Sequence, residues 1–93
     1  MKPDALHETS DLYHGLVAQL TPDLRVVECK DGIQWIIQRR EKGHAKRPWR
    51  GLAYCTTRAA LLRLGGGLEP RVDPEAWASL EALPERMGGR PHA

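Results

Sequence analysis

Residues 24–40, LRVVECKDGIQWIIQRR, decide how the rest of this 93-residue chain is arranged. Two runs rich in Val, Ile and Trp flank Asp31-Gly32, and these two residue types tolerate the positive φ angles of a two-residue hairpin turn. Such a turn fixes the register, so Val26 is expected to face Ile37. The pattern predicts an antiparallel hairpin with strands at 24–30 and 33–40.

The two faces of this hairpin differ in character, because successive side chains of a strand point to opposite sides. One face is apolar and is expected to form the core; it carries Leu24, Val26, Ile33, Trp35 and Ile37. The other face is mixed and is expected to be exposed; it carries Arg25, Val27, Cys29, Gln34, Ile36, Gln38 and Arg40. Since an isolated hairpin is marginal in water, we expect a third strand.

The chain after the hairpin supplies that strand at 49–55 and then a helix at 57–64. Thr56 is expected to cap the helix, and Gly65 to Gly67 to end it and begin a flexible linker. The predicted fold is therefore α+β, a three-stranded antiparallel sheet whose tryptophan-bearing face is covered by this helix.

Two flanking helices complete the predicted domain. Residues 10–20 place five apolar side chains along one side of a helix: Leu12, Tyr13, Leu16, Val17 and Leu20. Asp73 and Pro74 have the residue types of a helix start, which predicts a helix at 74–83. Residues 1–9 are expected to be disordered and 85–93 to form a flexible tail, so that 10–84 is a single domain.

The composition argues against several classes of protein. No apolar run approaches the roughly 20 residues of a membrane span, and the first residues lack a signal-peptide pattern, so a cytoplasmic protein is expected. Cys29 and Cys55 are too far apart for a disulfide framework or a short-spaced zinc site, and we expect both to be reduced and structural. The less favoured hypothesis is a nucleophilic role for Cys55. His44 would then act as the base, and a helix N-terminus would lower the pKa of the Cys55 thiol. No catalytic residue, metal or cofactor is expected.

The charge distribution is the main functional signal. The net charge is +2, yet residues 39–50 hold six Lys and Arg and one Glu, a balance of +5. Cations on a hairpin loop can follow phosphates, and Gln or Arg on a small sheet can reach base edges in a groove. The candidate nucleic-acid-binding residues are Arg25, Gln34, Gln38, Arg39, Arg40, Lys42, Lys46, Arg47 and Arg50.

The predicted order is three antiparallel strands and then a helix. Thr56 opens this helix, and Ala59 and Ala60 lie in its first turn. With Asp31-Gly32, Trp35 and Trp49, this order resembles the DNA-binding domain of plant AP2 factors and the arm-binding domain of phage-type tyrosine recombinases. The resemblance implies DNA contact through the sheet face away from the helix. The whole chain is also similar to small bacterial proteins carried on mobile elements, a likeness that implies no activity.

The sequence leaves a second class of function open. The acidic N-terminal region, with Asp4, Glu8, Asp11 and Asp23, would repel nucleic acid and favours a protein-interaction module such as a mobile-element inhibitor of a host enzyme. Exposed Val27 and Ile36, or a free sheet edge, would then contact a protein partner or a second copy of the chain.

Overall fold

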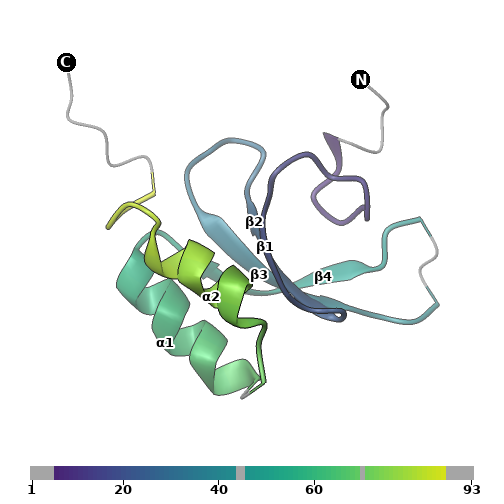
Figure 1. Cartoon of the computed structure of the whole chain (residues 1–93). Coiled ribbons are helices and arrows are strands. Elements are labelled where there is room, and N and C mark those ends of the chain that lie inside the picture. The colour runs from purple at the N-terminus through teal and green to yellow at the C-terminus, as the bar shows by residue number, and fades with distance from the viewer. Residues whose placement is uncertain (1–5, 44–45, 70, 88–93) are drawn as a thin grey trace.

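The computed structural model describes residues 6–43, 46–69 and 71–87, in which two helices lie against a four-stranded antiparallel sheet (Figure 1). The strands are β1 (Leu16–Thr21), β2 (Leu24–Glu28), β3 (Trp35–Arg40) and β4 (Trp49–Cys55), in the spatial order β1-β2-β3-β4. The helices are α1 (Arg58–Leu68) and α2 (Pro74–Glu81). The predicted α+β class and antiparallel sheet are confirmed, but the sheet has four strands rather than three.

The main core lies between the sheet and the two helices. The predicted apolar face is confirmed at four positions, because Leu24, Val26, Trp35 and Ile37 are each at most 2 % exposed. Leu61 of α1 and Leu80 of α2 close over them and are also fully buried. Ile33 is the exception: it lies in the loop after β2 and is 62 % exposed.

The β2–β3 hairpin has the predicted register but a different turn. Val26 faces Ile37, and Leu24 faces Arg39. The loop is wider than two residues, since the Gly32 N–H donates to the Cys29 carbonyl and the Cys29 N–H donates to the Gln34 carbonyl, both at 2.9 Å. Gly32 has a φ of 68°, whereas none of the described non-glycine residues has a positive φ, so the type I′ turn is wrong.

Residues 16–21 form β1, so the helix predicted at 10–20 is wrong. Ala18 and Leu20 are buried on either side of exposed Gln19, an alternation that suits a strand, and β1 pairs antiparallel with β2. Gly15 also has a specific role, because its carbonyl accepts from the Glu28 N–H at 2.8 Å and a Cβ there would lie 2.8 Å from the Glu28 carbonyl oxygen.

Helix α1 runs through the three glycines that were expected to stop it. Its cap is Thr57 rather than Thr56, with the Thr57 hydroxyl accepting from the Ala60 N–H at 3.2 Å. Trp77 of α2 packs against α1, and a Cβ at Gly65 would lie 3.5 Å from its ring. A methyl group there would make an ordinary van der Waals contact with that ring. The predicted linker is wrong over residues 65–68, because the helix continues through them.

Helix α2 begins as predicted, with Asp73 as cap and Pro74 in the first turn. After it the chain returns to α1: the Met87 N–H donates to the Thr56 carbonyl at 2.7 Å, and the Arg58 N–H donates to the Glu85 carbonyl at 2.9 Å. Within the described residues, no helix combines the length and apolar character that crossing a membrane requires.

Candidate functional site

The N-terminal segment, residues 6–15, lies over the outer face of the sheet, the face away from the helices (Figure 1). Tyr13 is 4 % exposed and forms a second apolar cluster with Val27, Cys29 and Ile36. Its hydroxyl donates to the Glu28 carbonyl at 2.7 Å, and burial raises the pKa of Tyr13 to about 12. The expectation that Val27, Cys29 and Ile36 face solvent is wrong, because this segment covers them.

Arg25 and Gln38, predicted to face a nucleic acid, are instead 2 % and 1 % exposed. The Arg25 Nε donates to the Gln38 side-chain oxygen at 2.8 Å, and its guanidinium donates to the carbonyls of Glu8 and Ser10, each at 2.9 Å. The Gln38 amide donates to the same Glu8 carbonyl at 2.9 Å. Burial lowers the pKa of Arg25 to about 10. These two side chains hold the N-terminal segment in place and are unavailable to a ligand.

Trp49 sits beside this network at the start of β4. The Arg25 guanidinium lies 4.2 Å from the Trp49 ring centroid, and that of Arg40 lies 5.0 Å from it. The Trp49 indole N–H donates to the Asp11 carboxylate at 2.7 Å, and the same carboxylate pairs with Arg40. Asp11 therefore offsets the charge of Arg40, and buried Trp49 fixes the base of the β3–β4 hairpin.

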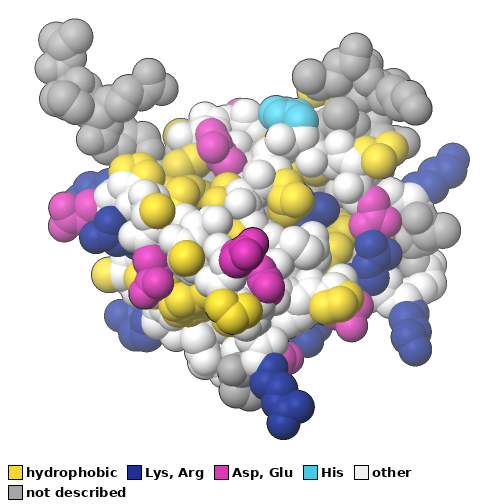
Figure 2. Space-filling view, viewed as in Figure 1, with side chains coloured by type: hydrophobic (Ala, Val, Ile, Leu, Met, Phe, Trp, Pro, Cys, Tyr) yellow, Lys and Arg dark blue, Asp and Glu magenta, His cyan; other side chains and the backbone are white. Residues whose placement is uncertain are grey.

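The other basic candidates lie in the β3–β4 hairpin, which extends away from the helices (Figure 1). We call residues 39–43 and 46–50 the basic arm. Its exposed cations are Arg40, Lys42, Lys46, Arg47 and Arg50, and Arg39 is half-buried. Figure 2 shows Lys and Arg side chains standing out from this side of the molecule.

Two local contacts restrain the arm. An Arg47 guanidinium nitrogen lies 2.9 Å from the His7 Nε2, and an Arg50 nitrogen lies 3.4 Å from a Glu41 carboxylate oxygen. Both contacts are exposed, so they stabilise the arm weakly and leave its cations accessible.

Gln34, the remaining candidate, lies at the opposite end of β3 in the β2–β3 loop. It is half-buried, and its carbonyl accepts from the Cys29 N–H. The basic arm and the amide side chains thus do not form one platform, because Gln38 is covered and Gln34 is distant along the sheet.

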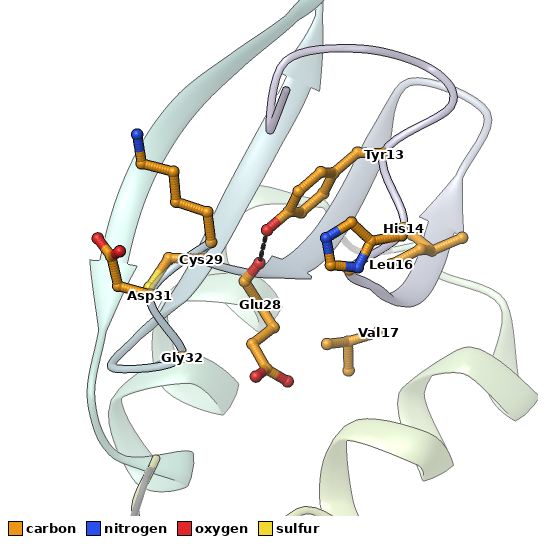
Figure 3. Close-up of a pocket in the computed structure, with 10 residues that line it drawn as sticks. Tyr13, His14, Leu16, Val17, Glu28, Cys29, Asp31 and Gly32 are labelled. Atoms are coloured by element: carbon orange, nitrogen blue, oxygen red, sulfur yellow. Dashed lines mark hydrogen bonds between the residues drawn. The ribbon is translucent and has the colours of Figure 1, made fainter. Parts of the chain in front are cut away.

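A hollow of about 370 Å³ lies between the N-terminal segment and the β2–β3 loop (Figure 3). Its walls include Tyr13, His14, Glu28 and Asp31, and the Tyr13 hydroxyl points at the Glu28 carbonyl. Across the described residues, no group of three or more His, Cys, Asp or Glu is placed to hold a metal ion.

Both cysteines are buried and unpaired with each other. Burial raises the pKa of the Cys55 thiol, and this effect is larger than the opposing effect of the Arg63 charge. The neutral thiol is a poor nucleophile, so the geometry does not favour Cys55 chemistry.

Comparison with family models, with curated proteins and with solved structures gives no match to this chain. The resemblance to AP2 and arm-binding domains stays a prediction. In this chain the sheet face that such domains use lies under the N-terminal segment, and the carbonyls of Glu8 and Ser10 occupy the donors of Arg25. The acidic N-terminal stretch, opposite in charge to Arg25 and Arg40, was the sequence signal for this cover.

Proposed function

We propose that this protein is a small, non-catalytic nucleic-acid-binding accessory protein whose basic arm holds the phosphate backbone. The observation that carries the proposal is the exposure of Lys42, Lys46, Arg47 and Arg50 on one hairpin. Glu41 is the one acidic residue in the sequence from 39 to 50, so the arm keeps a strong positive balance. When such cations neutralise phosphates, the counterions condensed on the nucleic acid are released, and this release drives binding.

The anchoring of the arm supports the same proposal. Trp49 is 3 % exposed and its backbone N–H donates to the Thr9 carbonyl at 3.1 Å. The base of the hairpin is therefore held on a packed scaffold while its cations remain in water. Because Arg25 and Gln38 are covered, the proposed contacts go to phosphates, which position a protein but carry little base information.

The test is a fluorescence-anisotropy titration of labelled duplex and single-stranded oligonucleotides at several salt concentrations. Lys46→Glu/Arg47→Glu is the arm variant, and Arg63→Glu/Arg71→Glu is a control with the same charge change at exposed sites outside the arm. Loss of two phosphate contacts is expected to weaken binding at least tenfold near 0.1 M salt and to lower the salt slope by about 1.8. The control should keep most of its affinity.

Two results would contradict the proposal. One is failure of the wild-type chain to bind either oligonucleotide at low salt. The other is an equal loss in the control variant, because that would assign binding to net charge rather than to the basic arm.

Exposed apolar side chains on edge strand β4 favour a second candidate, a protein-interaction module or homodimer. Leu52 is 41 % exposed and Tyr54 is 60 % exposed. Irregular pairing in both edge strands, β1 and β4, works against extension of the sheet by another chain. Light scattering would show a dimer in wild type and a monomer in Leu52→Ser/Tyr54→Ser if this surface pairs two copies.

A further inference from the structure

Arg39 and Arg50 face each other across β3 and β4 as directly opposed partners. Like charges in this position destabilise a sheet, so the pair is unfavourable for the isolated chain. Within the described residues, the one salt bridge of this pair joins Arg50 to the Glu41 carboxylate at 3.4 Å, and both of its side chains are exposed to water. An anion held between the two guanidinium groups would relieve the repulsion.

The Arg39–Arg50 pair lies on one side of the arm. Arg39 is opposite Leu24, a core residue on the helix-bearing face, so the two arginines belong to that face. Arg47 reaches His7, which belongs to the N-terminal segment over the outer face. The arm therefore presents cations on two opposite sides, and in Figure 2 the basic side chains stand out in different directions there.

We infer that Arg39 and Arg50 form a phosphate clamp and that the nucleic acid taken by the arm is double-stranded. This inference rests on the proposed function and specifies its ligand. A two-stranded ribbon fits the major groove of B-DNA, about 12 Å wide, whose two walls are phosphate backbones. An arm with cations on both sides contacts both walls, whereas a single strand offers one backbone and leaves one side unused.

The clamp itself is tested first, with inorganic phosphate and without nucleic acid. In thermal unfolding, phosphate is expected to raise the Tm of wild type more than that of Arg39→Gln, because only wild type holds both guanidinium groups. Without phosphate, Arg39→Gln should have an equal or higher Tm, since the substitution removes like-charge repulsion. Equal phosphate effects in the two proteins, or a lower Tm of the variant without phosphate, would overturn the clamp.

The ligand class is tested by anisotropy with a duplex and a single strand of equal length. Wild type is expected to bind the duplex about tenfold more tightly near 0.1 M salt, and Arg39→Gln/Arg50→Gln to lose about that factor for the duplex. Arg63→Gln/Arg71→Gln is the matched control and should bind as wild type.

The results distinguish failure of the phosphate clamp from failure of the proposed function. Equal or tighter binding of the single strand, or unchanged duplex binding by Arg39→Gln/Arg50→Gln, would overturn the inference while leaving phosphate binding by the arm intact. Binding of neither oligonucleotide would remove the proposed function, whatever phosphate does to the Tm.

Discussion

Replacement of Arg25 by Ala probes the contact on which the N-terminal segment depends. The side chain is 2 % exposed and donates hydrogen bonds to Gln38, Glu8 and Ser10. Ala would leave the Gln38 side-chain oxygen without its donor and would take one of two donors from the carbonyls of Glu8 and Ser10. It would also remove the cation next to the Trp49 ring. The substitution therefore tests whether Arg25 fastens the segment to the sheet.

The expected cost is about 3 kcal/mol of unfolding free energy. Hydrogen bonds to a charged group contribute about 1.5–3 kcal/mol each, and release of the buried cation from its desolvation penalty offsets part of the sum. For a domain of this size the loss corresponds to a fall in Tm of roughly 12 °C or more. Urea denaturation measures the free energy, and hydrogen exchange of residues 7–13 should show local loss of protection.

Arg63→Ala is the control, because Arg63 is exposed on α1 and its removal should change stability by less than about 0.5 kcal/mol. An Arg25→Ala protein as stable as this control, with residues 7–13 still protected, would refute the reasoning. It would mean that the other contacts of the segment, such as those of Tyr13, Asp11 and Gln38, hold it without Arg25.

Three further predictions concern single contacts. Tyr13→Phe is expected to lose about 1 kcal/mol at neutral pH, since the hydrogen bond to Glu28 disappears. Folding raises the pKa of Tyr13 from 10.0 to about 12, so wild type keeps this stabilisation below pH 10 and loses it as the pH rises through 12. In urea titrations over that pH window, the difference in unfolding free energy between wild type and Tyr13→Phe should therefore shrink and then reverse. Gly67→Ala should add about 0.5–1 kcal/mol of unfolding free energy and so raise the Tm, because Gly67 is helical and a Cβ there meets nothing within 4 Å. An unchanged Tm would argue against the extended α1. Gly15→Ala should lose about 2 kcal/mol in urea denaturation, because its Cβ would lie 2.8 Å from the Glu28 carbonyl oxygen, and wild-type stability would contradict that close approach.

The central part of the fold follows from local pattern. The apolar alternation around Val26 and Ile37 gave the strands, and the requirement to bury that face set the register even though the turn has another form. The start of α2 was likewise predictable, because Asp73 and Pro74 are local signals that need no distant contact.

The parts that could not be predicted depend on distant contacts. Leu16, Val17 and Leu20 fit a helical stripe as well as a strand, and the pairing with β2 decided between them. Arg25 and Gln38 are polar, so exposure was the reasonable expectation until Glu8 and Ser10 supplied buried acceptors. Gly65 resembles a helix stop in isolation, whereas in the structure it is a buried position of α1 next to the Trp77 ring.

In the candidate site too, the features set by local sequence were predictable and those set by distant contacts were not. Exposure of Lys42, Lys46 and Arg47 was predictable, because a short run of charged residues around Gly43 is expected to stay in water. The cross-strand pairing of Arg39 with Arg50 was not, since it depends on a bulge in β4 that shifts the register between Ile37 and Gln38.

The most direct test of the central claim is a two-dimensional ¹⁵N NMR titration of the chain with a short DNA duplex at low salt. Binding by the basic arm predicts that amide shifts concentrate in residues 39–43 and 46–50, with Arg25, Gln38 and the N-terminal segment nearly unchanged. Shifts centred on Arg25 and Gln38 with release of residues 7–13, or no shifts at all, would contradict it.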